Sequence, residues 1–293
     1  MRKLLAFTLL ISSSCIALAQ TARLGNLSTR ALCETGEAVL VDEFILQGTG
    51  TEMLLMRGIG PSLGSVGVPD PLRDPTVNLL NTRGWLLDFN DNWMDNPDKV
   101  AIIATGLAPT DPHESAIIDT LKPGLYTFVE KGNQHGQGVA LPEIFDLLDG
   151  TLQLSAVGTR GFISTADNVM IAGFILTGNG PASLLIRALG PSLADVGLTG
   201  VLPDPVLELH NASGEVIFSN DNWRDTQEQE IIATGLAPVD DFESAMLVML
   251  SPGAYTLVFS GVSGSTGLGF LQTYSLELPV RELDPAPIIR HRN

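Results

Sequence analysis

Cysteine, histidine and basic side chains are all scarce in this sequence of 293 residues. It has 2 cysteines, 4 histidines and 16 Lys and Arg residues against 33 Asp and Glu residues. With so few cysteines, a small disulfide-stapled scaffold is excluded. The formal net charge of −17 argues against a nucleic-acid partner, because phosphates must be neutralised by Lys and Arg, and it disfavours anionic lipid for the same reason.

The first 19 residues have the order of a secretory signal peptide. Arg2-Lys3 is followed by the apolar run 4–11 and then by Ala17-Leu18-Ala19 before Gln20. The apolar run is too short to span a bilayer, and no later run reaches that length. We predict cleavage after Ala19, export to the periplasm, cell surface or medium, and no membrane insertion of the mature chain.

Two cysteines bear on this interpretation. Cys15 offers a lipoprotein alternative, but the serines before it do not match a lipoprotein cleavage site. Cleavage after Ala19 leaves Cys33 alone, so no intramolecular disulfide can form. The apolar surroundings of Cys33 indicate a buried small side chain instead of a reactive thiol.

An internal repeat organises the rest of the chain. Residues 44–63, FILQGTGTEMLLMRGIGPSL, align with residues 174–193, FILTGNGPASLLIRALGPSL, at an offset of 130. At an offset of 129, IIATGLAP occurs at both 102–109 and 231–238. A period of this length is a whole domain and not a solenoid unit. We therefore predict two domains, copy 1 at 24–150 and copy 2 at 151–279, followed by a loose tail at 280–293.

The pattern within each copy predicts an all-β fold. Short apolar runs alternate with Gly, Asn and Asp turns about every ten residues, which is typical of antiparallel sandwiches. Residues 61–67 and 97–106 instead have the Pro start and Gly stop of short helical turns. We expect two tandem antiparallel β-sandwiches of jelly-roll type, each with one or two such turns.

Two family resemblances rest on these repeated segments. NTRGWLLDFNDNW (81–93) and KPGLYTFVEKG (122–132) recur as NASGEVIFSNDNW (211–223) and SPGAYTLVFSG (251–261). These segments resemble bacterial pre-peptidase C-terminal domains, and the resemblance implies a jelly-roll module of a secreted protein. The frame from R-x-x-GPSL to GLAP-x-D-x-x-ES-A resembles uncharacterised tandem repeats of secreted verrucomicrobial and planctomycete-type proteins. Neither resemblance implies an established activity.

Charged residues retained in both copies are the first candidates for a site. Arg57 and Arg187 lie inside apolar runs, where an arginine needs a carboxylate or carbonyl partner. We interpret each as half of a fold-specifying ion pair, with a ligand-binding arginine as the alternative. The acids predicted as partners are Glu114 or Asp74 for Arg57 and Glu243 or Asp204 for Arg187.

Retained loops of Asn, Asp and Trp give the remaining candidates. Their hard oxygen ligands could hold calcium, although ordinary turn chemistry is the alternative. The tryptophans beside them could stack on a sugar ring, although a half-buried core position is the more common one for tryptophan. The metal candidates are Asp74, Asn90, Asp91, Asp204, Asn220 and Asp221, and the ligand-binding candidates are Trp93 and Trp223 together with the two arginines.

No residue set points to catalysis. The sequence has no G-x-S-x-G, H-E-x-x-H, P-loop or Cys–His metal pattern, and no histidine is retained between copies. Glu114 and Glu243 could act as glycosidase acids only beside a second carboxylate. We therefore predict a non-enzyme, without catalytic residues.

Export, duplication and the retained loops together favour a binding or adhesion module for a surface polysaccharide or another envelope component. Repeated weak sites gain from avidity. The alternatives are a self-associating surface-layer protein and a secreted hydrolase or its accessory. Calcium is the only cofactor that the loops suggest.

Overall fold

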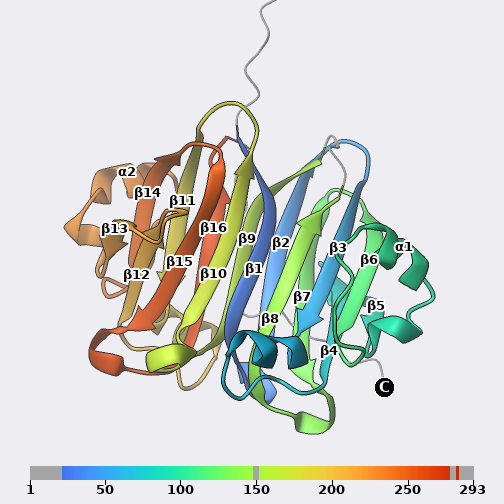
Figure 1. Ribbon diagram of the computed structural model, residues 1–293. Helices are drawn as coiled ribbons and strands as arrows, with labels where there is room; N and C mark the ends of the chain where they lie inside the picture. The colour runs from blue at the N-terminus through green and yellow to red at the C-terminus, as the bar shows by residue number, and fades with distance from the viewer. Residues whose placement is uncertain (1–21, 148–151, 278–281, 284–293) are drawn as a thin grey trace, which may run out of the picture.

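The computed structural model describes residues 22–147, 152–277 and 282–283 (Figure 1). The predicted signal peptide, Cys15 and nearly all of the predicted tail lie outside the described residues. Within them the chain is mostly antiparallel strand, which confirms the all-β prediction. No helix in these ranges is long and apolar enough to cross a membrane.

The strands of the two copies match one for one. Copy 1 contributes β1 (Arg23–Cys33), β2 (Leu40–Gly48), β3 (Glu52–Ile59), β4 (Pro75–Asn81), β5 (Leu86–Asn90), β6 (Ser115–Leu121), β7 (Gly124–Gly132) and β8 (Gly138–Asp146). Copy 2 contributes β9 (Leu152–Ile163), β10 (Met170–Thr177), β11 (Ala182–Leu189), β12 (Pro205–His210), β13 (Val216–Asn220), β14 (Ser244–Leu250), β15 (Gly253–Gly261) and β16 (Gly267–Ser275).

Short helical turns join these strands. The α-helices are α1 (Lys99–Ala104) and α2 (Glu228–Ala233), one in each copy. The 3₁₀ turns are Gly36–Ala38, Pro61–Val66, Trp93–Asp95 and Asn133–His135 in copy 1, and Ala166–Asn168, Pro191–Val196, Trp223–Asp225 and Val262–Gly264 in copy 2. The turn at Pro61–Val66 begins with proline and ends at Gly67 with φ of 89°, the left-handed conformation that glycine adopts without strain. The helical turns predicted at 61–67 and 97–106 are thus confirmed.

Antiparallel pairing builds two continuous sheets, and each passes from one copy into the other. Sheet A runs β13-β12-β15-β10-β1-β8-β3-β6, and sheet B runs β5-β4-β7-β2-β9-β16-β11-β14. The copies join where β1 pairs with β10 in sheet A and where β2 pairs with β9 in sheet B. Parallel bridges between β1 and β9 link everything into one 16-stranded assembly.

The predicted pair of separate sandwiches therefore differs from the structure. The copies lie side by side (Figure 1), and both of their sheets continue from one copy into the other. Equivalent residues meet at the junction, where the buried hydroxyls of Thr29 and Thr159 are hydrogen-bonded at 2.8 Å. One hydrophobic cluster contains residues of both copies, including Phe44, Phe128, Phe174 and Phe259. Burying the two edge strands of each copy against each other removes exposed backbone donors and acceptors, which favours fusion.

The core of copy 1 contains two buried carboxyl groups that copy 2 lacks. Asp42 of β2 and Glu130 of β7 occupy the positions of Ala172 and Phe259. Burial raises the pKa of Asp42 to about 7, an effect that nearby Thr159 partly offsets. Burial is also the main reason that the pKa of Glu130 lies well above its usual range. The charges of Asp42 and Glu143 raise it further. Neither carboxyl oxygen of Glu130 has a hydrogen-bond partner among the described residues.

Candidate functional site

The two retained arginines are hydrogen-bonded within the protein, to partners other than the acids predicted for them. Arg57 of β3 donates from Nε to Oε2 of Glu143 at 2.8 Å and from Nη1 to the carbonyl of Leu107 at 2.5 Å. Arg187 of β11 binds Gln272 and the carbonyl of Leu236 in the same geometry. Glu143 lies beside Arg57 because β8 is the strand neighbour of β3. That pairing could not be seen in a comparison restricted to retained charges, since the counterpart of Glu143 is neutral Gln272.

Glu114 and Glu243 instead brace the Gly-Pro-Ser-Leu turns. Oε1 of Glu114 accepts hydrogen bonds from the amides of Gly60 and Ser62 and from the Ser62 hydroxyl at 2.5 Å, while Oε2 accepts from the amide of Asp111. Glu243 has the matching partners in copy 2. Burial raises the pKa of Glu243, and its hydrogen bonds partly offset the rise. Carboxylates that are fully occupied in this way hold loops in place and are poorly placed for proton transfer to a substrate.

The retained tryptophans are buried, which agrees with the core alternative and leaves no exposed ring for stacking on a sugar. The exposed fractions are 8% for Trp93 and 1% for Trp223. Each indole donates a hydrogen bond of 3.0 Å, Trp93 to the carbonyl of Asp111 and Trp223 to that of Asp240. Such a residue anchors its loop to the core and has no ring face free for a ligand.

The predicted metal ligands divide into two groups. Asn90 and Asn220 are committed to the backbone, since each side-chain oxygen accepts from the amide of Ala116 or Ala245 at 2.9 or 2.8 Å. Both side chains therefore brace turns. Burial raises the pKa of Asp91, and the charge of Asp74 adds to the rise.

The second group of predicted metal ligands is the four aspartates, Asp74 and Asp91 in copy 1 and Asp204 and Asp221 in copy 2. In copy 2, burial raises the pKa of Asp204, and the charge of Asp221 raises it further. The Oδ1 atoms of Asp74, Asp91 and Asp204 are buried and have no hydrogen-bond partner among the described residues. Over those same residues, no three acidic, histidine or cysteine side chains converge as a metal site would require.

A groove that sequence reasoning missed lies on copy 1. Its volume is about 460 Å³, and it is formed by β4, β5 and β7 with the turns at Gly36–Ala38 and Asn133–His135. Val39 and Val129 form an apolar floor. Phe89, which is 49% exposed, lies beside this floor. Polar side chains surround the floor, among them Glu34, Asn78, Lys131, Asn133, Gln134 and His135.

The groove side chains differ from those of copy 2. Phe89, Lys131 and His135 have Ser219, Ser260 and Gly264 as their counterparts. His135 has φ of 66°, in the left-handed region where its counterpart is glycine with φ of 75°. A non-glycine residue is held there at a cost of about 1 kcal/mol. Copy 1 therefore keeps an imidazole at this rim despite the strain.

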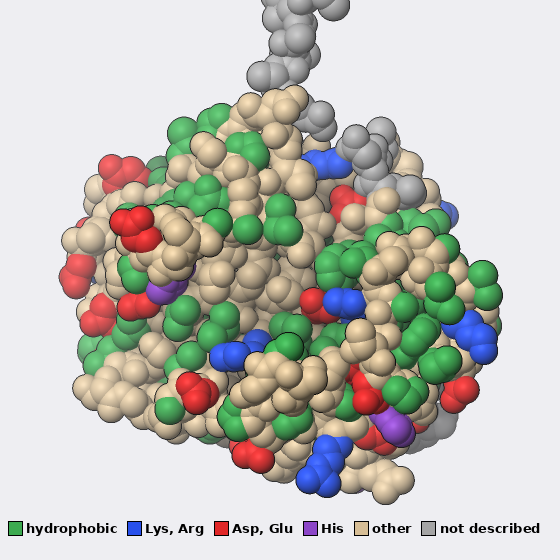
Figure 2. Space-filling view, in the orientation of Figure 1, with side chains coloured by type: hydrophobic (Ala, Val, Ile, Leu, Met, Phe, Trp, Pro, Cys, Tyr) green, Lys and Arg blue, Asp and Glu red, His purple; other side chains and the backbone are tan. Residues whose placement is uncertain are grey.

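Exposed apolar side chains extend from the groove along β5. Trp85, Leu86 and Leu87 are all exposed, and the Arg83 guanidinium lies 5.3 Å from the Trp85 ring centroid. β5 ends sheet B, and β13, its counterpart with exposed Val216 and Ile217, ends sheet A. Hydrophobic side chains are visible over the copy 1 half in Figure 2, on the side where β5 and α1 lie in Figure 1.

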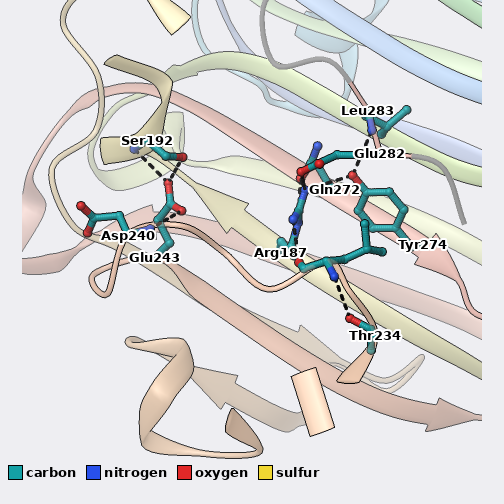
Figure 3. A network of polar contacts seen from close by, with 10 residues as sticks. Arg187, Ser192, Thr234, Asp240, Glu243, Gln272, Tyr274, Glu282 and Leu283 are labelled. Atoms are coloured by element: carbon teal, nitrogen blue, oxygen red, sulfur yellow. Dashed lines mark hydrogen bonds and ion pairs between the residues drawn. The ribbon is translucent and has the colours of Figure 1, made fainter. Parts of the chain in front are cut away.

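Two more cavities lie between the copies. One of about 580 Å³ is lined by Arg23, Phe145, Ile175 and neighbouring residues of β1, β8 and β10. The other, of about 540 Å³, contains Leu125, Arg187, Glu243 and Glu282. The second holds the polar network drawn in Figure 3.

Comparisons with known proteins leave the family open. No protein-family model and no curated protein matches the sequence, so the two family resemblances stay predictions. A solved structure with weak similarity is a DUF4785 family protein from Legionella pneumophila, at 10% identity and a TM-score of 0.23. The match covers 93% of this chain and 70% of that protein. A similarity of this size indicates neither a shared fold nor a shared function.

Proposed function

We propose that this protein is an exported, non-catalytic binding module that holds a cell-surface glycan or another envelope component in the copy 1 groove. The observation that carries the proposal is the combination, in one groove, of an exposed aromatic ring with polar and charged side chains. Sugar rings present an apolar face beside hydroxyl groups, so recognition uses ring stacking together with hydrogen bonds. Phe89 supplies the ring, and Asn78, Lys131 and His135 supply polar contacts.

Strain at His135 supports the same assignment. Backbone conformations of this kind persist where surrounding structure and function require them. Copy 2 adopts the conformation with glycine at Gly264, so the fold alone does not need a side chain at this position. A contact between the imidazole and the ligand would account for keeping a side chain at this position.

A panel of bacterial surface polysaccharides and envelope fractions tests the proposal with the mature protein. We expect saturable binding to at least one member and binding at least about tenfold weaker for Phe89→Ala. Phe242→Ala is the matched control, because Phe242 is also exposed but lies in copy 2, away from the groove. The proposal would be overturned if the protein bound no member of the panel, or if both variants lost binding equally.

A second function, self-assembly into a surface layer, is favoured by the exposed edge strands. β5 and β13 end the two sheets and expose apolar side chains, and unprotected edges of this kind pair with other chains. Light scattering across a concentration series tests it. Assembly that Leu87→Lys abolishes would support this function, whereas a monomer at all concentrations would exclude it.

A further inference from the structure

The same buried arginine obtains its countercharge differently in the two copies. In copy 1, Glu143 of the neighbouring strand β8 supplies a carboxylate to Arg57. In copy 2 the position of Glu143 is taken by Gln272, whose neutral side-chain oxygen accepts from Nε and Nη2 of Arg187 at 2.9 and 2.5 Å. The Arg187 side chain is only 2% exposed, so it needs a carboxylate from elsewhere.

A C-terminal residue provides that carboxylate. Oε1 of Glu282 lies 3.1 Å from Nη2 of Arg187. The next residue, Leu283, is 1% exposed and belongs to the hydrophobic cluster that contains Ile45, Leu125 and Tyr274. Figure 3 shows both residues next to the Tyr274 hydroxyl, with the Glu282 side chain toward Arg187.

Two further differences between the copies fit the C-terminal residues. Tyr274 replaces Phe145, and its hydroxyl oxygen lies 3.2 Å from the amide of Leu283, which donates to it, and 3.1 Å from Nη2 of Arg187. Gly158 replaces Ser28, and a β-carbon at position 158 would lie 2.8 Å from the Leu271 carbonyl oxygen, 2.9 Å from the Phe270 ring and 3.0 Å from Cδ1 of Leu283. Copy 2 thus differs from copy 1 at three places that Glu282 and Leu283 contact. These are the strand residue beside the arginine, the tyrosine hydroxyl and the glycine at position 158.

The two C-terminal residues are held in different ways. Leu283 is enclosed, whereas the Glu282 side chain is 64% exposed at the cavity of about 540 Å³ between the copies. Peptide-binding sites use buried anchor side chains in pockets and arginine–acid pairs, and both features occur here.

We propose that Arg187, Gln272, Tyr274 and Gly158 form a recognition site for an extended peptide with glutamate followed by leucine, and that residues 282–283 of this chain are its resident ligand. Arg187 binds the glutamate carboxylate, and the Tyr274 hydroxyl accepts a hydrogen bond from the leucine amide. The space above Gly158 accepts the leucine side chain. The described residues of copy 1 form no such site, because Glu143 already supplies the carboxylate beside Arg57 and Ser28 takes the place of Gly158.

Three full-length mature variants and two peptides test the proposal. The release variant Glu282→Gln/Leu283→Ala removes both contacts of the resident ligand. Gln272→Glu, added to the release variant, restores a carboxylate from β16 as Glu143 does in copy 1. Glu143→Gln is the matched control for losing a carboxylate elsewhere. The probe is a labelled synthetic peptide of residues 278–289, and a second peptide carries glutamine in place of Glu282.

The release variant should melt several degrees below wild type and should bind the peptide saturably, with its melting temperature restored. The glutamine peptide should bind at least about tenfold more weakly, and wild type, whose site is occupied, should not bind. Gln272→Glu should restore the melting temperature and abolish peptide binding. Glu143→Gln should destabilise the protein without creating peptide binding.

Several results would overturn the proposal. They are a release variant that melts like wild type, a folded release variant that does not bind the peptide, and equal binding of the two peptides. Stoichiometric peptide binding by wild type would also overturn it, because the site would then not hold the chain's own residues. If the release variant fails to fold, the Gln272→Glu triple variant decides: folding supports the proposal and failure to fold refutes it.

Discussion

Phe89 and His135 line one groove of copy 1 from different elements, β5 and the turn Asn133–His135, and each differs from its counterpart in copy 2. Residues retained in both copies, by contrast, hold the fold together. Arg57, Trp93 and Asn90 are all hydrogen-bonded into the protein. Retention between the copies is thus a guide to structure in this chain, and the proposed ligand site rests on residues in which the copies diverge.

Stability should fall as the pH rises from about 4 to about 7. In the unfolded chain Asp42 ionises near its ordinary pKa of 3.8, whereas in the folded chain it holds its proton up to about 7. Between these values the folded state binds more protons, so raising the pH favours unfolding, by on the order of 4 kcal/mol for full burial. Glu130 adds a change of the same sign. Denaturant unfolding at a series of pH values measures the effect.

Asp42→Asn isolates the contribution of this carboxyl group. The variant should be more stable than wild type above pH 7 and close to it near pH 4, because the amide does not ionise. Asp167→Asn is the control at an exposed position and should leave the pH slope unchanged. A stability that is flat or rising between pH 4 and pH 7 in wild type would contradict the buried, neutral Asp42.

Truncating either retained tryptophan should destabilise the protein and leave its ligand preference unchanged. Trp93→Ala and Trp223→Ala each remove a buried ring and orphan a backbone carbonyl, which costs about 3–5 kcal/mol. Urea unfolding gives the loss, and Trp223→Phe should retain more stability than Trp223→Ala. A variant as stable as wild type with lost glycan binding would return the tryptophans to the list of ligand residues.

Calcium bound by Asp74 with Asp91, or by Asp204 with Asp221, should raise the melting temperature of chelator-stripped protein. The reason is that a ligand that binds only the folded state stabilises that state. The double variant Asp91→Asn/Asp221→Asn should lose this response. It should also melt above wild type without calcium, because burial and the neighbouring Asp74 disfavour the ionised Asp91. An unchanged melting curve on calcium addition would leave both loops as ordinary turns.

Local features of the fold could be predicted from the sequence, whereas its global pairing could not. Alternating apolar residues gave the strands, and proline and glycine gave the turn at Pro61–Val66. The continuity of the sheets depends on pairs such as Phe44 with Val157, which lie in different copies. Edge strands carry no local sign of their partner, since an apolar strand can pair within its own copy or with the next.

The site residues escaped prediction for a related reason. Comparing the copies selects side chains that both need, and these are the ones that stabilise each turn and strand. Glu143 was passed over because Gln272 had replaced it, and Phe89 because Ser219 had. The strained backbone of His135 could be recognised only once its φ of 66° was known.

The proposal that copy 1 carries the ligand site can be tested most directly by giving its groove the copy 2 residues. Binding of a responding surface glycan to Phe89→Ser/His135→Gly would be titrated against wild type and the Phe242→Ala control. We expect at least about tenfold weaker binding for the double variant, with unfolding free energy within about 1 kcal/mol of wild type because glycine relieves the strain at position 135. Undiminished binding by a folded double variant would contradict the account.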